Sequence, residues 1–396
     1  MKKTVKKIVI VLVLVIVALV GTIGFTWKDE IASVASFHKI RERNASHGDA
    51  NVYEMTMAGD YYIDKFVEQG GVSSDAELID FVIGNITKGV VDISMPTPQI
   101  GCSSFTASTA AGDALFARNY DMHTTHAAIV HTSASGDRHA TVSTVDLGLL
   151  GMDAESEVDG LKDRLTCLAA VYAPLDGMND AGVSCGVYMT YQGPEGEVTA
   201  TNQDTDKPDM TTTTFLRLVL DYADDLDEAV EIAQSYDMHD SAGTSYHYMV
   251  ADASGRSAIF EWVAADDDTD TDGSARELRV TYNDDDAAFG EVEAAADYQW
   301  VTNFVLEPNY YASDDAKKGL DRYNELYTRL SATDGIVADE SAAMDVLAAV
   351  GRRSWNNDDA NTITVHSVVY NLTDRVMYWV PNENYDDASA WITYKL

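Results

Sequence analysis

Residues 101–121 read Gly101-Cys-Ser-Ser-Phe-Thr-Ala-Ser-Thr-Ala-Ala-Gly-Asp-Ala-Leu-Phe-Ala-Arg-Asn-Tyr-Asp121. Apolar and polar residues alternate over 102–106 and again over 114–119, which predicts two short β-strands joined by a turn. The second strand would bring Arg118 and Asp121 back beside Cys102. A cysteine reacts as its thiolate, and a neighbouring cation lowers the pKa of a thiol. The stretch therefore indicates a candidate nucleophile, although a buried packing cysteine beside a surface Arg–Asp pair would give the same pattern.

Further strands and helices follow along the chain. The segments 246–262 and 363–380 each hold two alternating runs around a turn, which predicts two β-hairpins. Apolar residues at helical spacing predict three helices, over 212–236, about 314–330 and 338–352. Before Cys102, Ser74 and Glu77 form a capping-box pattern that predicts a helix after residue 74. Strands, then helices, then strands again predict an α+β body built in layers rather than alternating βαβ units.

Composition and charge exclude several classes of protein. The chain has 396 residues, of which 46% are hydrophobic, enough for a substantial core, so global disorder is excluded. Its 27 Lys and Arg against 65 Asp and Glu give a net charge of −38. Binding a nucleic-acid backbone needs a dense basic face, so nucleic acid is excluded as a partner. Three cysteines are too few for a disulfide scaffold.

The N-terminus has the pattern of a membrane anchor. Four lysines lie among the first seven residues, and an uninterrupted apolar run follows over Ile8–Val20. Apolar character continues to Trp27, which makes the segment long enough to span a bilayer. Positive charge before the run and Asp29 and Glu30 after it place the body of the protein outside the cell. A cleaved signal peptide is the alternative, but no clear small-x-small cleavage site is present.

These patterns divide the chain into three parts. Residues 1–27 are expected to be a signal anchor or signal peptide, so the protein is either a single-pass membrane protein or secreted. Residues 28–101 would form a pre-segment, with a charged stalk to about residue 50 and an ordered part that ends in a proline-containing loop, Met95-Pro-Thr-Pro98. Residues 102–396 would form the layered α+β body, which begins at the candidate nucleophile Cys102.

Several blocks of sequence, taken in order, resemble a known family. They are 101–121, Asp176-Gly-Met-Asn-Asp-Ala-Gly-Val183, His247-Tyr-Met-Val-Ala-Asp-Ala-Ser-Gly-Arg256, Val301-Thr-Asn303 and Asp321-Arg-Tyr323. Together, over roughly 102–385, they resemble the choloylglycine hydrolase and penicillin V acylase family and the related isopenicillin N acyltransferases. Ala117 replaces the glycine that this family has before its arginine. The resemblance implies the fold of an N-terminal-nucleophile hydrolase, an αββα sandwich of two antiparallel sheets flanked by helices.

The resemblance also implies roles for individual residues. Cys102 would become the nucleophile once cleavage of the Gly101–Cys102 bond frees its α-amine. An α-amine has a pKa of about 7.7–8.0, so it can take the thiol proton and later protonate the leaving amine. Asp121 would hold this amine, and Arg118 and Arg322 would favour the thiolate.

Two further residues would stabilise the oxyanion. Asn303 would donate its side-chain amide, and a second donor would come from Tyr188 or Met189, of which Tyr188 is preferred. Simpler interpretations exist for two of the implied residues. Asn303 would then only cap the turn before Pro308, and Arg322 would be a solvated helix residue that pairs with Asp321 or Glu325.

Other polar residues have structural explanations. Asn179 fits a turn. Cys167 and Cys185 fit packing positions on core strands, and a disulfide between them is an open alternative if the two are neighbours. Asp268-Thr-Asp-Thr-Asp-Gly273 matches the start of a calcium loop, but Arg279 stands where the twelfth-position glutamate belongs, so a solvated acidic loop is preferred. Three histidines after the Asp121 strand would line a pocket mouth rather than hold zinc; they are His123, His126 and His131.

The expected function is hydrolysis of a linear amide C–N bond through an acyl-thioester on Cys102. The substrate would be an N-acyl amine or N-acyl amino acid, with bile-salt and penicillin-type amides as candidates. No metal or organic cofactor is needed, because nucleophile, base and oxyanion donors all belong to the chain. Two alternatives stay open: acyl transfer from the same thioester to an amine, and a surface binding module on a catalytically dead scaffold. A homo-oligomer also stays open.

Overall fold

The computed structural model describes most of the chain. The described residues are 24–91, 93, 101–122, 126–191, 198–264, 270, 272–283, 288–289, 292–293, 297–308, 310–312, 315–353 and 363–396. None of the helices within these ranges is long and apolar enough to cross a bilayer. The apolar run Ile8–Val20 and the loop around Pro96 lie outside the described residues, so the predicted anchor and loop remain predictions.

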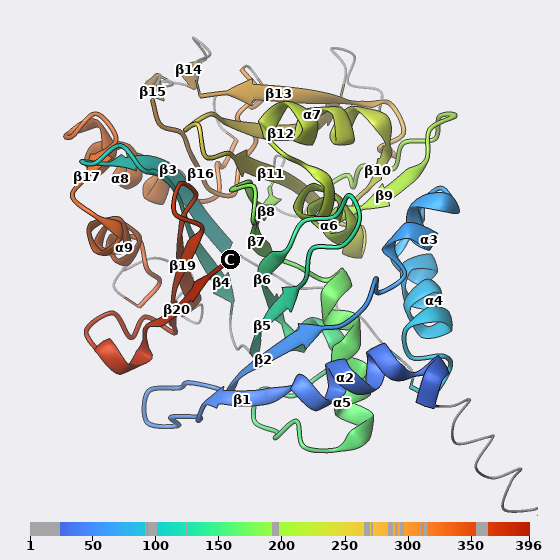
Figure 1. The fold of residues 1–396 in the computed structure, drawn as a ribbon. Helices are drawn as coiled ribbons and strands as arrows, with labels where there is room; N and C mark the ends of the chain where they lie inside the picture. Colours follow the sequence, from blue (N-terminus) through green and yellow to red (C-terminus); the bar gives the residue numbers. More distant parts are fainter. Residues whose placement is uncertain are drawn as a thin grey trace, which may run out of the picture.

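Two large sheets form the centre of the molecule (Figure 1). The nine-stranded sheet has the order β1 (His38–Arg41), β2 (Val52–Met57), β5 (Ala127–Thr132), β6 (Thr141–Asp146), β7 (Asp176–Asn179), β8 (Ser184–Thr190), β11 (Ser245–Ala251), β12 (Ser257–Ala264) and β13 (Arg276–Tyr282). The second sheet has the order β16 (Trp300–Val301), β3 (Gly101–Thr109), β4 (Ala114–Met122), β18 (Ile363–Asn371), β19 (Val376–Pro381) and β20 (Ile392–Lys395), and β17 (Ile336–Val337) also pairs with β3. Two short pairs complete the strands: β9 (Asp209–Thr211) with β10 (Asp237–His239), and β14 (Ala288–Phe289) with β15 (Val292–Glu293). The predicted strands at 102–106 and 114–119 and both predicted hairpins are confirmed.

The two sheets face each other across a shared apolar core. Phe116 and Val368 of the second sheet belong to the same buried cluster as Ile129, Val142 and Val187 of the nine-stranded sheet. Because β3 and β4 line this interface, their inward side chains meet those of β7 and β8. A polar site placed here is shielded from bulk water by both sheets.

Helices cover the outer faces of both sheets (Figure 1). α6 (Thr212–Tyr222) and α7 (Leu226–Ser235) lie against the nine-stranded sheet, and α8 (Leu320–Ser331) and α9 (Glu340–Ala349) pack on the second sheet. The single helix expected over 212–236 is interrupted, because Ala223 is extended and Asp225 caps a new helix. Short 3-10 helices occupy Leu147–Leu150 (η1), Leu168–Tyr172 (η2), Ser241–Gly243 (η3) and Ala388–Ala390 (η4).

The pre-segment is folded onto the domain rather than standing away from it. The expected stalk instead forms α2 (Lys28–Ser36) and the edge strand β1, and β2 pairs in parallel with β5. α3 (Ile63–Glu68) and α4 (Asp75–Asn85) then pack with α5 (Leu161–Cys167) in a second buried cluster. The predicted cap of α4 is present, since Ser74 Oγ accepts from Glu77 N at 3.3 Å. The charged stretch 28–50 gave no apolar period from which to predict α2 and β1, and the edge strand β1 buries little surface.

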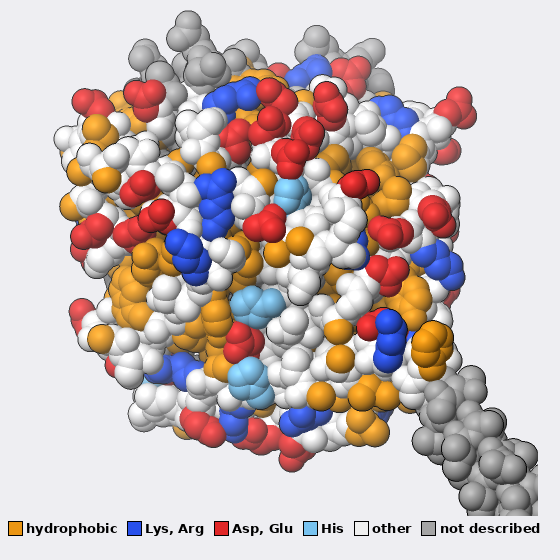
Figure 2. Space-filling model, viewed as in Figure 1, with side chains coloured by type: hydrophobic (Ala, Val, Ile, Leu, Met, Phe, Trp, Pro, Cys, Tyr) orange, Lys and Arg blue, Asp and Glu red, His pale blue; other side chains and the backbone are white. Residues whose placement is uncertain are grey.

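The surface is strongly acidic, as the net charge of −38 requires. Figure 2 shows Asp and Glu side chains spread over much of the visible face, with Lys and Arg interspersed as small separate groups. On this face no continuous basic patch is visible among the described residues.

Candidate active site

Cys102 lies in the interface between the two sheets. It is the second residue of β3, opposite Tyr120 of β4, and it is fully buried. Its Sγ is 3.4 Å from Arg118 Nη2 and 3.8 Å from the carbonyl oxygen of Val187 on β8. The thiol therefore contacts a cation from its own sheet and a backbone group from the facing sheet.

Arg118 joins the two sheets through both ends of its guanidinium. Its Nη1 donates to Leu175 O at 2.7 Å and to the Asp176 carboxylate, and its Nη2 donates to Val187 O at 2.6 Å. Burial acts to raise the pKa of Asp176, but the charges of His366 and Arg118 outweigh it and hold this pKa at about 2. Asp176 thus stays ionised and fixes the orientation of the arginine beside the thiol.

Burial dominates the ionisation of the thiol in the uncut chain. It raises the pKa of Cys102, while the charge of Arg118 acts in the opposite direction and Asp121 adds to the rise. The nearby arginine was expected to lower the pKa of Cys102, but in the uncut chain the net shift of this pKa is upward. Deprotonation of Cys102 needs a base close to the sulfur, or water admitted to the site.

Asn303 and Arg322 surround the backbone of Cys102. Asn303 Oδ1 accepts from Cys102 N at 2.9 Å and from Arg322 Nη2 at 2.8 Å, while Asn303 Nδ2 donates to Met189 O at 2.8 Å. Arg322 Nη1 donates to Cys102 O at 2.5 Å and lies 3.4 Å from Asp121 Oδ2. Both side chains are buried, so neither a simple turn cap nor a solvated helix position describes them.

Asp121 sits beside the bond that would be cut. It pairs with Gly101 across β3 and β4, accepts from Thr364 Oγ1 at 2.7 Å and lies 3.1 Å from Arg352 Nε. A Cβ on Gly101 would come within 2.7 Å of Arg352 Nη2 and 3.3 Å of Asp121 Oδ2. Only glycine fits before Cys102 without displacing these groups.

The register of β8 distinguishes Tyr188 from Met189. Val187 N donates to Leu175 O, away from β11, so alternation directs the N–H of Met189 away from β11 as well. Met189 O confirms this direction, because it accepts from Asn303. Tyr188 instead faces His247 in the β8–β11 ladder, and its hydroxyl donates to Ser104 Oγ at 2.6 Å. The backbone donor that faces the cysteine side belongs to Met189.

A buried His–Glu pair holds the Asn303 loop, and the sequence alone did not mark it as functional. His247 Nε2 donates to Thr302 O at 2.9 Å, and its Nδ1 lies 2.9 Å from Glu261 Oε1. Glu261 also accepts from the backbone N–H groups of Leu306 and Glu307 at 2.8 to 3.1 Å. The pair therefore fixes the loop on both sides of Asn303. Arg352 and Thr364 were missed for a similar reason, because only the fold brings them to Asp121.

Several residues that were assigned structural roles lie outside this cluster. Asn179 closes its turn by accepting from Val183 N at 2.9 Å and donating to Ala223 O at 2.8 Å. All three cysteines are free and buried, and Cys167 ends α5 rather than lying on the strand expected for it. Cys185 does lie on β8.

The possible metal ligands do not gather. Asp268 and His123 lie outside the described residues, whereas Asp270 pairs with Arg276 at 3.5 Å. His131 bonds to Glu54 at 2.9 Å, and His126 lines a separate pocket near α5. Among the described residues no three His, Cys, Asp or Glu side chains are arranged to hold a metal ion.

Comparisons with solved structures give distant likenesses. A mutant of the conjugated bile acid hydrolase from Clostridium perfringens is 14% identical with a TM-score of 0.45, over 74% of this chain and 97% of that chain. Penicillin V acylase from Agrobacterium tumefaciens is 14% identical with a TM-score of 0.41, over 71% and 83%. The Caenorhabditis elegans orthologue of N-acylethanolamine-hydrolyzing acid amidase is 17% identical with a TM-score of 0.40, over 74% and 100%. Likeness at this level does not by itself establish a common fold, and no curated protein matches the chain in sequence.

A family model gives the assignment. The model named acyl-coenzyme A:6-aminopenicillanic acid acyl-transferase matches residues 108–385, more than two thirds of the chain. The matched range contains Arg118, Asp121, Asn303 and Arg322 and begins shortly after Cys102. The resemblance found in the sequence is thereby confirmed: the chain belongs to the acyl-coenzyme A:6-aminopenicillanic acid acyl-transferase family.

Proposed function

We propose that the protein breaks a linear amide C–N bond through an acyl-thioester on Cys102, after cleaving its own Gly101–Cys102 bond. The observation that carries this proposal is the convergence on one residue. Cys102 has Asn303 on its backbone nitrogen, Arg322 on its carbonyl and Arg118 on its sulfur, all buried. A packing cysteine has no need of three polar side chains on its three polar atoms.

Self-cleavage would precede catalysis. The sulfur of Cys102 would attack the Gly101 carbonyl carbon, so that a C–S bond forms and the Gly101–Cys102 C–N bond breaks. The freed nitrogen takes the proton that the thiol loses. Water then hydrolyses this internal thioester, which leaves a carboxylate on Gly101 and returns the thiol. The α-amine would remain next to Asn303 Oδ1, which already accepts from this nitrogen in the uncut chain.

The mature site would then use the α-amine as its base. A free α-amine titrates at about 7.7–8.0, so near neutral pH it can accept the thiol proton and later protonate the leaving amine. Three buried guanidiniums, of Arg118, Arg322 and Arg352, face the two carboxylates of Asp121 and Asp176. Among these five side chains, three positive charges against two negative ones leave one positive charge that would balance the thiolate. The N–H of Met189 and the second amide hydrogen of Asn303 would receive the oxyanion, so Met189 replaces Tyr188 as the proposed backbone donor.

The acceptor of the acyl group defines two forms of this proposal. Water would make the protein a hydrolase, and an amine would make it an acyltransferase. Both use the same thioester, and the family name favours the acyltransferase no less than the hydrolase. A catalytically dead binding module is the remaining alternative. Against it stands the intact cluster around Cys102, which a binding role would not require.

We further propose that the protein acts outside the cell, at the membrane or secreted. The lysines before Ile8–Val20 and the acidic residues after it support export. Membrane fractionation of cells expressing the full chain, with and without carbonate washing, tests this. Release of the protein by the wash would contradict an uncleaved anchor.

The first test of the enzyme proposal is the intact mass of the purified protein beside its Cys102→Ala variant. We expect the wild type to split before Cys102 and the variant to remain whole. A screen of N-acyl amines, with and without an added amine acceptor, then separates hydrolysis from transfer. A wild type that stays uncut and whose thiol does not react with an N-acyl substrate would contradict the proposal.

A further inference from the structure

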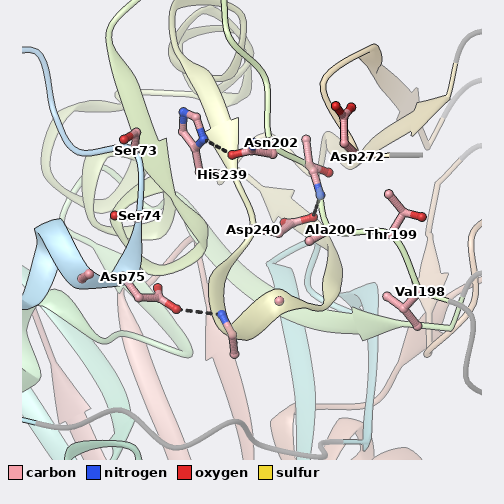
Figure 3. Close-up of a pocket in the computed structure, with 14 residues that line it drawn as sticks. Ser73, Ser74, Asp75, Val198, Thr199, Ala200, Asn202, His239, Asp240 and Asp272 are labelled. Carbon is pink, nitrogen blue, oxygen red and sulfur yellow. Dashed lines mark hydrogen bonds between the residues drawn. The ribbon is translucent and has the colours of Figure 1, made fainter. Parts of the chain in front are cut away.

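An open pocket lies between the pre-segment and the turn that leads into β11. It has a volume of about 540 Å³, within the usual range for small-molecule sites. The start of α4, residues 198–202 and residues 239–243 form three of its walls, and Asp272 closes a fourth side. Figure 3 shows Asp75, Asp240 and Asp272 on different sides of this space.

The described lining of this pocket is acidic. It carries three carboxylates and no Lys or Arg, and its one histidine is already paired. His239 lies 2.8 Å from Asp209 Oδ1 and 2.9 Å from Asn202 Oδ1, so both of its ring nitrogens already have partners. Arg276, behind the lining, acts on Asp240 electrostatically but donates to Trp262 O and pairs with Asp270. The pocket as a whole therefore favours a positively charged ligand.

Two buried oxygens of the lining lack a partner. Asp240 Oδ2 accepts from Thr201 N at 2.8 Å, but Asp240 Oδ1 is buried and makes no hydrogen bond. The hydroxyl of Thr201, which is 1% exposed, makes no hydrogen bond of good geometry, although it acts on the neighbouring Asp240 carboxyl. Burial raises the pKa of Asp240 to about 7, and the hydrogen bonds from Thr201 and the charge of Arg276 offset this rise only in part. Unsatisfied buried oxygens at one point indicate a missing donor.

The N-terminus of α4 points to the same pocket and by itself would favour an anion. Two of its backbone donors, Glu77 N and Leu78 N, are already bonded to Ser74, however. Ser74 Oγ accepts from Glu77 N, and Glu77 Oε2 accepts from Ser73 N at 2.9 Å. Asp75 accepts from Ala242 N at 2.7 Å and adds its own negative charge. Of the carboxylates at this helix end only Asp75 lines the pocket, and its negative charge disfavours an anion there.

The pocket adjoins the candidate active site through Tyr246. This residue faces Met189 across β8 and β11, three positions after Gly243 of the pocket wall. The pKa of Tyr246 is raised by burial and further by the charges of Asp240, Asp75 and Cys102.

We propose that this pocket binds an organic ammonium group, with Asp240 as its principal acceptor, and that the substrate of the Cys102 site is an amide bearing such a cation. The inference rests on the proposed function for its second half only. An ammonium donates three hydrogens, which suits Asp240 Oδ1, the Thr201 hydroxyl and one further oxygen. No described set of ligands fits a metal ion here, so an extended organic cation is the better match for the volume.

The binding half is tested on the uncut Cys102→Ala protein by calorimetry with 1,5-diaminopentane. We expect saturable binding that weakens by about tenfold in an added Asp240→Asn substitution, equal to about 1.4 kcal/mol. Asp227→Asn serves as the matched control, since Asp227 pairs with Arg256 on the surface. Thr201→Val, a second pocket variant, should also weaken binding. Binding of 1,5-pentanediol as tight as that of the diamine, or binding unaffected by Asp240→Asn, would overturn the proposal.

The substrate half is tested on the wild type with a matched pair, N-acetyl-1,5-diaminopentane and N-acetyl-pentylamine. We expect a higher kcat/KM for the cationic amide, and a cation-to-neutral ratio that falls about tenfold in Asp240→Asn. Equal turnover of both amides would sink this half and leave the amidase proposal standing. Asp240-dependent binding of the diamine without cleavage of either amide would leave the binding half standing and contradict the amidase proposal.

Discussion

Two buried clusters of charge lie on the two faces of the nine-stranded sheet. The thiol cluster consists of Cys102, Arg118, Asp121, Asn303 and Arg322. The clamp cluster joins the pre-segment to α6: Tyr61 Oη donates to Asp221 Oδ1 at 2.7 Å, and Arg217 Nη2 donates to the same oxygen at 2.6 Å. Both clusters are inaccessible and both hold arginines, yet only the first has polar groups that converge on a reactive atom. Burial and charge alone therefore do not mark an active site, and the proposal for the thiol cluster rests on the convergence of polar groups on Cys102.

The largest expected effect falls on the clamp cluster. Asp221→Ala leaves the Arg217 guanidinium buried without its carboxylate, which typically costs about 3–5 kcal/mol of folding free energy. Urea unfolding of the intact chain measures this loss. Asp227→Ala is the control, because its partner Arg256 is 46% exposed and such surface pairs contribute about 0–1 kcal/mol. Equal losses in the two variants would mean that the clamp is no more than a surface-type contact.

The thiol cluster should respond in activity rather than in stability. Asn303→Ala removes one proposed oxyanion donor and the acceptor for the α-amine, so turnover should fall by at least about 10²–10³. Asn324→Ala on the exposed face of α8 is the matched control and should keep full turnover. Thermal unfolding of both variants accompanies the kinetic measurement. A loss of turnover no larger than that of the control would exclude Asn303 from the chemistry.

The sequence predicts the thiol cluster better than the clamp for a physical reason. Strands β3 and β4 are adjacent in sequence, so alternation and one turn suffice to place Arg118 and Asp121 beside Cys102. Tyr61 and Asp221 are 160 positions apart and meet only because β2 pairs in parallel with β5. No local pattern encodes such a contact. Arg352 was missed for the same reason, because it is far from Asp121 in sequence. The orientation of the Asn303 amide is known only from the structure, where Cys102 N and Arg322 both donate to its oxygen.

The pH dependence of stability tests whether Asp176, the carboxylate that holds Arg118 beside the thiol, is ionised in the folded protein. The pKa of Asp176 is held at about 2, below its ordinary value of 3.8, so its contribution is present above pH 4 and is lost as the pH falls toward 2. At about 1.4 kcal/mol per unit, this amounts to about 2 kcal/mol. Urea unfolding of the wild type and Asp176→Asn should therefore show a difference in stability that shrinks as the pH falls from 5 to about 2. A difference independent of pH would show that Asp176 is not ionised in the folded protein.

A smaller effect is expected for the pair that positions the Asn303 loop. Glu261→Gln keeps the size of the side chain but weakens its bonds to His247 and to the backbone of Leu306 and Glu307. We expect kcat to fall about tenfold with KM changed less than about twofold, because the loop acts on the transition state. Glu277→Gln, which removes an exposed charge next to Arg279, is the control. A rise in KM with kcat unchanged would assign Glu261 to substrate binding instead.

The smallest effect is expected for the association of the pre-segment with the rest of the domain after cleavage at Gly101. Five residue pairs join β2 to β5, and the clamp adds the Tyr61 hydroxyl, so we expect the two pieces to remain associated on size exclusion. Tyr61→Phe deletes one hydrogen bond to Asp221 and keeps the ring under Arg138 and Arg217. Such a bond contributes about 1 kcal/mol, which corresponds to about fivefold faster or more extensive release of the pre-segment in urea. Tyr62→Phe, whose hydroxyl bonds to Glu30 within the pre-segment itself, is the matched control. If the two pieces of the cut wild type already separate without urea, the clamp cluster stabilises only the uncut precursor. The clamp cluster would then matter for folding before cleavage, and the thiol cluster for catalysis after it.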